Sequence, residues 1–251
     1  MKRVIIIGAS SGIGRKLAEY YAGVGCRVAI AARRVELMKQ IAAEFPNNII
    51  YSKIDVSTSA QSIEHELNGL ITRLGGLDLI IYSSGAGKQC QNISATEEIK
   101  TTKVNIDGFI AVISTAFNFF KDNGNNAFGT QICNYQPQIV TIASIAGIKG
   151  LGIAASYSAS KRFQINYMEA LDQLAHKLQL NITLSTIMPG FVDTDFIKKG
   201  KYPFVMSLDH ASNHIINAIE SKKKKAIINF KWRLIALIWK LSPSFLIKKF
   251  I

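Results

Sequence analysis

Short apolar runs alternate with segments of helical period along most of the chain. Polar residues rarely interrupt the runs, which is typical of strands that are buried on both faces of a sheet. Six strands are expected, at residues 4–7, 28–31, 49–54, 79–82, 138–142 and 182–187. Helices are expected between them, near residues 14–24, 35–45, 60–74, 101–121 and 157–178. This alternation predicts a doubly wound α/β fold with a parallel sheet.

No internal repeat or linker-like stretch divides the 251 residues, a length that one large domain can hold. Because 48% of the residues are hydrophobic and only five are proline, the chain can bury a sizeable core. We therefore expect one domain over residues 1–251, in which residues 195–251 form a lid and a basic, apolar tail. The polar segment 122–136 is expected to be a surface excursion.

The cysteines and histidines favour no metal site and no disulfide. Three cysteines without metal-ligand spacing are typical of reduced thiols in an intracellular protein, so a cytoplasmic location is expected. The apolar run before Gly8 is too short for a signal peptide. His210 and His214 have i, i+4 spacing, but no acidic or thiol ligand stands near them, and a surface helix is the better interpretation.

A glycine-rich turn joins the first strand to the first helix. Its candidate cofactor residues are Gly8, Ser10, Ser11, Gly12, Ile13 and Gly14. Glycine lets the backbone turn tightly and approach a pyrophosphate, whose charge then lies at the helix N-terminus. On this motif alone, a glycine-rich turn without a ligand remains the alternative.

The second strand ends in two arginines, Arg33 and Arg34, and the next carboxylate is Glu36. A carboxylate at this position accepts from the ribose 2′-hydroxyl of NAD, whereas a cation suits the 2′-phosphate of NADP. A planar guanidinium can bind a phosphate through two parallel hydrogen bonds. The residues therefore favour NADP(H), with a solvated basic loop as the alternative.

Tyr157 and Lys161 are four residues apart in an expected helix, so both side chains lie on one face. An ammonium beside a phenol favours the phenolate, so the pKa of Tyr157 is expected to fall from about 10 toward neutral pH. Tyr157 could then exchange a proton with a substrate oxygen. The alternative is a packed Tyr beneath a snorkelling Lys.

Further candidates belong to motifs that follow in chain order, and they are Asp55, Val56, Ser84, Gly85, Asn105, Ser144, Pro189, Gly190, Val192 and Thr194. Of these, Ser84, Ser144 and Pro189 lie at the carboxyl ends of expected strands, where a doubly wound sheet binds its ligands. Taken singly, Asn105 and Ser144 would be a helix residue and a turn residue. Taken together, the ordered motifs over about residues 7–194 resemble the classical short-chain dehydrogenase/reductase (SDR) family.

The resemblance implies a role for each residue of the reacting centre. Tyr157 is the general acid or base, and Lys161 lowers its pKa and hydrogen-bonds the nicotinamide ribose. Ser144 orients the substrate carbonyl, and Asn105 helps to hold a water that continues a proton relay through Lys161. Hydride transfer between nicotinamide and the carbonyl carbon then needs no metal.

The resemblance also assigns the cofactor contacts and shows two departures. Asp55 and Val56 resemble the pair that contacts adenine, and residues 189–194 resemble the loop over the nicotinamide. Ile7 stands where relatives usually have Thr, and Ser83 stands where they usually have Asn. The family further implies a homodimer or homotetramer.

The C-terminal part of the chain carries most of the net charge of +13. Residues 198–251 hold 12 Lys and Arg against 2 Asp and Glu, and the remaining residues hold 18 against 15. Two Trp among basic and aliphatic residues suggest that residues 222–251 lie on an anionic membrane surface. An equally open alternative is that this tail packs on the body as a lid or at a subunit interface. Its apolar run is too short to span a bilayer.

The sequence therefore predicts an NADP(H)-dependent oxidoreductase that acts on a carbonyl or alcohol substrate. Apolar and Lys residues in the expected lid favour a lipophilic substrate, with a 3-oxoacyl thioester as the alternative. A non-enzymatic alternative is an NADP-binding sensor or membrane scaffold on the same fold. Nucleic-acid binding is not expected, because the basic region is interleaved with aliphatic residues more than with stacking aromatics.

Overall fold

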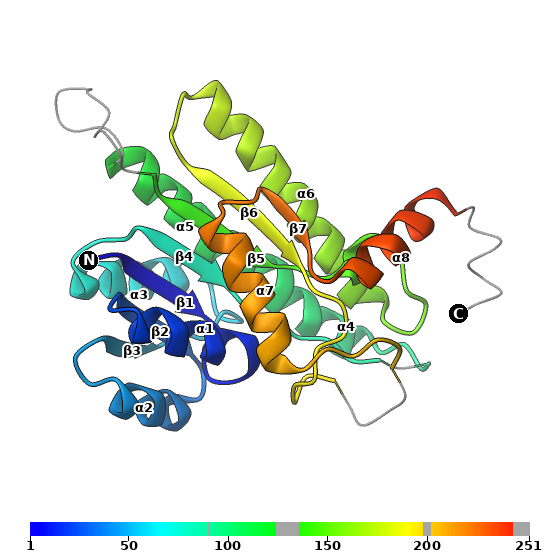
Figure 1. Cartoon of the computed structure of the whole chain (residues 1–251), viewed down its shortest axis with the longest axis horizontal. Helices are drawn as coiled ribbons and strands as arrows, with labels where there is room; N and C mark the ends of the chain where they lie inside the picture. The colour runs from blue at the N-terminus through cyan, green and yellow to red at the C-terminus, as the bar shows by residue number, and fades with distance from the viewer. Residues whose placement is uncertain (90, 124–135, 198–201, 243–251) are drawn as a thin grey trace.

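The computed structural model describes residues 1–89, 91–123, 136–197 and 202–242 (Figure 1). Within them, seven parallel strands form one sheet in the order β3-β2-β1-β4-β5-β6-β7. The strands are β1 Arg3–Ile7, β2 Arg27–Ala32, β3 Ile49–Lys53, β4 Leu79–Tyr82, β5 Gln138–Ile142, β6 Thr183–Met188 and β7 Lys225–Ile227. The doubly wound α/β fold predicted from the sequence is confirmed.

Helices cover both faces of this sheet (Figure 1). They are α1 Gly12–Gly23, α2 Val35–Glu44, α3 Ala60–Leu74, α4 Ala95–Thr102, α5 Gly108–Asn123, α6 Ala155–Lys177, α7 Leu208–Glu220 and α8 Phe230–Leu241. On β1, Val4 and Ile6 pack in the core that contains α1, α2 and α7, whereas Ile5 and Ile7 pack in the core with α3, α5 and α6. Successive strand residues face opposite sides, so an uninterrupted apolar strand serves both cores.

The order of the strands reverses between β1 and β4. Ile7 at the end of β1 pairs with Ala31 on one side and with Tyr82 on the other. The chain leaves β1 toward one face and β4 toward the other, which opens a crevice beyond the carboxyl ends of these strands. This switch point places the glycine turn beside the segment that follows β4.

The helix expected near residues 101–121 is divided. The chain forms α4, then a π-helical segment at Lys103–Asp107, and then α5. Such wide turns inside a helix commonly mark functional sites. The segment contains Asn105, which is fully buried, so the interruption coincides with a predicted catalytic residue.

Part of the C-terminal region packs on the sheet, as one of the two alternatives left open by the sequence expects. The strand β7, which was not predicted, pairs with β6, and ion pairs join Lys224 to Asp172 at 2.9 Å and Lys225 to Glu169 at 2.6 Å. These contacts attach β7 to α6. Two of the four consecutive lysines therefore have carboxylate partners.

The helix α8 follows β7 and lies beyond that edge of the sheet (Figure 1). The interpretation of both Trp residues as membrane-interfacial is wrong for Trp232, whose side chain is 1% exposed. Residues 243–251 of the expected tail, Cys90, Cys133 and most of the predicted surface excursion lie outside the described residues. Within those described, no helix is long and apolar enough to cross a bilayer.

Candidate active site

A cavity of about 390 Å³ lies beyond the carboxyl ends of the central strands. The sequence-predicted residues that line it are Gly8, Ser10, Ser11, Gly12, Ile13, Gly14, Arg33, Arg34, Val56, Ser84, Gly85, Ser144, Tyr157, Lys161, Pro189, Gly190, Val192 and Thr194. Asp55 and Asn105 are not among its lining residues. The fold thus brings the glycine turn and the Tyr–Lys pair, almost 150 residues apart in the chain, into one cavity.

The glycine turn works by keeping side chains out of a crowded junction. Gly8 has φ of +89°, and a Cβ on it would lie 2.5 Å from the Ser84 amide nitrogen. Gly12 has φ of +56° at the start of α1, and a Cβ on Gly14 would collide with the Gly8 carbonyl oxygen. Only glycine suits these positions. The first turn of α1 contains no acidic residue, so no carboxylate of that turn competes for the positive end of the helix.

The two arginines after β2 have different surroundings. The Arg34 guanidinium donates to the hydroxyl oxygens of Ser10 at 2.9 Å and Ser11 at 2.6 Å, so it is bound to the glycine turn. Arg33 is exposed and lines the cavity. A glycine turn, a helix N-terminus and two guanidinium groups together form a set of donors that suits the phosphates of a dinucleotide.

The Asp55 side chain forms hydrogen bonds within the turn in which it lies. Its Oδ1 atom accepts from the Ser57 amide at 2.9 Å and from the Ser57 hydroxyl at 2.7 Å. Burial raises the pKa of Asp55, but the Ser57 bonds and the charge of Arg33 outweigh burial and hold it below its usual value. Asp55 does not cap the next helix, because Ser59 is the N-cap of α3. Its contact with adenine stays a prediction.

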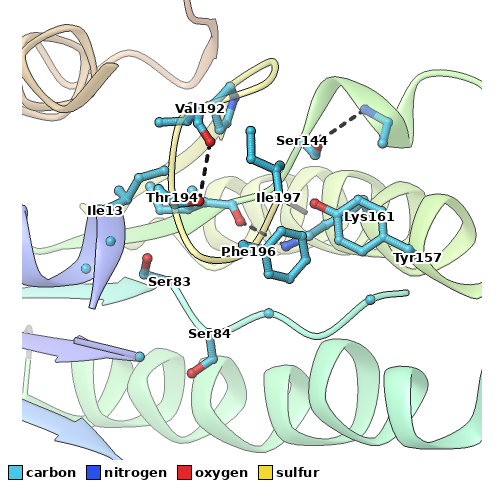
Figure 2. Close-up of a pocket in the computed structure, with 18 of the residues that line it drawn as sticks. Ile13, Ser83, Ser84, Ser144, Tyr157, Lys161, Val192, Thr194, Phe196 and Ile197 are labelled. Atoms are coloured by element: carbon cyan, nitrogen blue, oxygen red, sulfur yellow. Dashed lines mark hydrogen bonds between the residues drawn. The ribbon is translucent and has the colours of Figure 1, made fainter. Parts of the chain in front are cut away.

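Tyr157 and Ser144 meet at the opposite end of the cavity. Tyr157 lies in the first turn of α6, and Ser144 precedes the 3₁₀ turn Ile145–Gly147 that follows β5. Ser144 accepts from the Ala146 amide at 3.1 Å, which fixes its side chain, and its hydroxyl lies near the Tyr157 phenol, whose pKa it lowers. Figure 2 shows the Tyr157 ring beside Phe196, at 5.6 Å between ring centroids. The phenol and the serine hydroxyl therefore face the same space.

Lys161 lies one turn along α6 from Tyr157 and is 3% exposed (Figure 2). Its Nζ atom donates to the Ile142 carbonyl at 3.1 Å and to Oε1 of Gln164 at 3.0 Å. It lies 5.8 Å from the centroid of the Tyr157 ring. Burial lowers the pKa of Lys161 to about 7.

The expected lowering of the Tyr157 pKa is wrong for the chain by itself. Burial raises the pKa of Tyr157 above its ordinary value, and the nearby Ser144 hydroxyl offsets only part of this effect. A medium of low polarity disfavours both the phenolate and the ammonium, so burial acts in opposite directions on the two pKa values. The phenol is therefore protonated at neutral pH, as a proton donor must be.

Asn105 acts behind the cavity wall. Its side-chain amide donates to the Ala86 carbonyl at 2.7 Å and accepts from the Ala86 amide at 2.8 Å. The same Nδ2 atom lies 2.9 Å from the Ser160 hydroxyl. Asn105 thus holds the segment after β4 against α6, and its main-chain carbonyl accepts from Gln164 at 2.9 Å.

The loop after β6 is supported by α8. Trp232 packs directly on Gly190, where a Cβ would collide with the indole nitrogen, and on Phe191 at 5.6 Å between ring centroids. Val192 pairs with Met206, so the chain returns along this loop. From the expected lid, Phe196, Ile197 and Tyr202 line the cavity.

Sequence reasoning missed three residues that matter here. A Cβ on Gly87 would lie 2.5 Å from the Tyr157 ring, so this glycine makes room for the phenol. The sequence Gly85-Ala86-Gly87 was the available signal. Gln164 contacts Lys161, and Trp232 supports Gly190, but neither contact had a signal in the spacing of the chain.

Comparisons with known proteins agree with this geometry. The family model for short chain dehydrogenases matches residues 2–201. An uncharacterized oxidoreductase of Mycobacterium tuberculosis is 27% identical over 254 residues, covering 96% of this chain and 94% of that protein. A 3-oxoacyl-[acyl-carrier-protein] reductase of Mus musculus is 26% identical, covering 77% of this chain and 76% of that protein.

Solved structures share the fold. A short chain dehydrogenase from Burkholderia cenocepacia in complex with NADP has a TM-score of 0.81 at 18% identity, covering 99% of this chain and 98% of that chain. A 3-ketoacyl-(acyl-carrier-protein) reductase from Brucella melitensis complexed with NADH has a TM-score of 0.75 at 20% identity, covering 90% and 94%. With the family model matched over most of the sequence, the chain belongs to the short-chain dehydrogenase family and is an oxidoreductase.

Proposed function

We propose that this enzyme transfers hydride between NADP(H) and a lipophilic carbonyl or alcohol substrate. The observation that carries the proposal is the meeting of Tyr157 and Ser144 in the same cavity as Arg33 and Arg34. A proton donor and a phosphate-binding set at opposite ends of one cavity suit a nucleotide-dependent reduction. A sensor or scaffold would need no such proton donor.

The substrate end of the cavity supports a lipophilic substrate. Its apolar and aromatic lining residues include Leu151, Phe196, Ile197, Tyr202 and Trp239. Cavities of this kind bind apolar ligands, while a few polar groups fix the orientation. Ser144 and Tyr157 supply those polar groups.

The reaction then follows from the arrangement of the side chains. The cofactor, when bound, supplies or accepts the hydride. In the reducing direction, the Tyr157 phenol donates its proton to the substrate oxygen, and the Ser144 hydroxyl orients that oxygen. The nearby Lys161 ammonium stabilises the phenolate that remains, and Lys161 is also the group proposed to bind the nicotinamide ribose.

The test measures NADPH and NADH consumption with a panel of ketones, aldehydes and acyl thioesters. We expect turnover with an apolar ketone or aldehyde and a clear preference for NADPH. Arg33→Ala should narrow that preference by about tenfold, the value of one charge-assisted hydrogen bond. Arg27→Ala, at the opposite end of β2, is the matched control and should leave the preference unchanged. Equal affinities for the two cofactors in the wild-type enzyme would contradict the assignment.

A 3-oxoacyl thioester is the second candidate substrate. The mouse relative is named as a reductase of this class, and the exposed Lys88 lies at the cavity, where it could attract an acidic carrier. The same panel decides between the candidates. Faster turnover of an acyl thioester than of simple ketones would favour the second. We further propose that the enzyme is a cytoplasmic homodimer or homotetramer.

We also propose that α8 lies on an anionic membrane surface. Its outer face exposes Phe230, Leu234, Leu237 and Leu241, each at least half exposed and spaced by four, three and four residues. This spacing forms one apolar stripe on a helix. Ile238 borders the stripe and is 54% exposed.

The charged residues beside the apolar stripe indicate which kind of surface it would bind. Lys231 lies on one side of it, and Arg233 and Lys240 lie on the other, while residues 221–242 contain no Asp or Glu. An apolar stripe flanked by cations is typical of helices that bind anionic lipid surfaces. Trp239 on the inner side of α8 lines the cavity, so a bound surface would lie near the source of a lipophilic substrate.

Sedimentation with vesicles tests this contact. We expect binding to phosphatidylserine-containing vesicles, weaker binding at high salt, and loss of binding in the double variant Leu234→Ser, Leu237→Ser. Leu178→Ser, at an exposed position after α6, is the control. If the double variant instead changes the oligomeric state and the wild type never sediments with vesicles, the stripe is a protein interface and the membrane proposal is wrong.

A further inference from the structure

A buried glutamine on α6 connects two parts of the reacting centre. Gln164 is 0% exposed and lies three residues after Lys161. Its Oε1 atom accepts from the Lys161 ammonium at 3.0 Å, and its Nε2 atom donates to the main-chain carbonyl of Asn105 at 2.9 Å. One amide thus bridges Lys161 and the π-helical segment.

The orientation of this amide follows from its partners. A main-chain carbonyl can only accept a hydrogen bond, and an ammonium can only donate one. Nε2 must therefore face Asn105, and Oε1 must face Lys161. Because both amide groups have partners, the desolvation cost of burying the side chain is offset.

We propose that Gln164 is a positioning residue that holds the Lys161 ammonium at the cavity wall. The proposal deepens the proposed function and rests on it. Lys161 uses two of its three N–H groups on the Ile142 carbonyl and on Gln164. The Nζ atom lies near Gly85, since a Cβ there would be 3.8 Å away. The remaining N–H group is thereby available to the cavity.

The Gln164 bridge also concerns the proton relay that the family resemblance implies. The family resemblance implies a water that links Asn105 to Lys161 in a relay. In this chain an amide makes that link directly, and an amide neither gains nor loses a proton near neutral pH. Gln164 therefore positions Lys161 without carrying protons.

The groups around Lys161 make its titration simple to interpret. Among the described residues, Tyr157 on α6 is the titratable group that faces it, and burial lowers the pKa of Lys161. Glu98 of α4 is bound to the Ser156 amide at 2.8 Å, and Tyr82 of β4 is bound to the Val104 carbonyl. Loss of the Gln164 oxygen should therefore act directly on the ammonium.

The experiment compares Gln164→Met with Gln138→Met. Gln138 is also a buried glutamine with two hydrogen bonds, to the Ser185 hydroxyl at 2.9 Å and to the Ile219 carbonyl at 3.2 Å. It lies at the amino end of β5, whereas Lys161 binds the carboxyl end of the same strand. Both variants remove one buried amide, so similar losses of thermal stability are expected.

Only Gln164→Met should change the reacting centre. We expect its NADPH affinity and its kcat/KM to fall about 10- to 100-fold, the loss that follows from one hydrogen bond to a charged group. The high-pH limb of its kcat/KM profile should move to lower pH, because the ammonium has lost an acceptor. Gln164→Glu keeps an acceptor and adds a negative charge, so its limb should move to higher pH.

Opposite displacements of the limb in Gln164→Met and Gln164→Glu would support the proposal, and a purely structural role would not produce them. Equal losses in Gln164→Met and Gln138→Met, with unchanged pH profiles, would overturn it. If the wild-type enzyme reduces no carbonyl in the panel, the proposed function fails. NADPH affinity still tests Gln164 in that case, because a selective loss in Gln164→Met supports the positioning role and an unchanged affinity overturns it.

Discussion

The two ends of the cavity are built in different ways. At the nucleotide end, the wall includes the backbone of one short turn, in which Gly8 and Gly14 leave room for no side chain, together with Arg33 and Arg34. At the reacting end, the wall consists of side chains from α6, the 3₁₀ turn and the loop after β6, which Trp232 supports from α8. The first end depends on local steric fit. The second depends on packing between segments far apart in the sequence. Substitutions at the two ends should therefore affect stability, catalysis and NADPH affinity to different extents.

The largest loss of stability is expected at the support of the reacting end. Trp232→Ala should lower the free energy of unfolding by about 3–5 kcal/mol, because it empties a buried site against Gly190, Phe191 and Phe204. Catalysis should fall with it, since the loop after β6 loses its support. Chemical denaturation and steady-state kinetics measure both effects. Phe230→Ala, exposed on the same helix, should change the unfolding free energy by less than about 0.5 kcal/mol.

A smaller loss of stability, caused by steric overlap, is expected at the nucleotide end. Gly14→Ala places a methyl group against the Gly8 carbonyl and should cost about 1–3 kcal/mol of stability. NADPH affinity should fall more than tenfold, because the turn must move. Gly23→Ala, at the other end of α1, meets no atom within 4 Å and should be neutral or slightly stabilising. If both variants bind NADPH equally well, the steric account of the turn is wrong.

The smallest effect is a dependence of stability on pH that arises from Lys161. Its pKa is about 7 in the folded chain against an ordinary 10.5, so between these values the unfolded chain binds more protons. The destabilisation is fully present below pH 7 and is relieved as pH rises. Without nucleotide, the wild-type unfolding free energy should gain about 1 kcal/mol between pH 7 and 8 relative to Lys161→Met. A constant difference between the two proteins would contradict this account.

Most of the fold could be predicted from local patterns in the sequence. Six of the seven described strands were predicted, because each is a short apolar run between polar or glycine-rich turns. The strand β7 was missed because three residues beside a lysine run show no alternation, and its place depends on pairing with β6. The division of the helix near Asn105 was missed as well, because a π-helical segment leaves no mark in hydrophobic period.

The residues of the candidate site also differ in how well the sequence predicted them. The ends of parallel strands meet at one edge, so ordered motifs after the strands predicted which residues would line the cavity. Asp55 and Asn105 lie outside it because Asp55 binds its own turn and Asn105 binds the segment after β4 and Ser160, which residue identity alone does not reveal. The predicted direction of the Tyr157 pKa shift was wrong because burial, a property of the whole fold, raises this pKa more than Ser144 lowers it.

The central claim is that Tyr157 is the proton donor of an NADP(H)-dependent reduction. The most direct measurement compares kcat/KM and NADPH affinity in Tyr157→Phe and in Tyr167→Phe, which alters a ring stacked on Phe163 farther along α6. We predict that Tyr157→Phe loses about 10²- to 10⁴-fold in kcat/KM and keeps NADPH affinity within a few-fold, while Tyr167→Phe stays close to wild type. Turnover by Tyr157→Phe at the wild-type rate would contradict the mechanism.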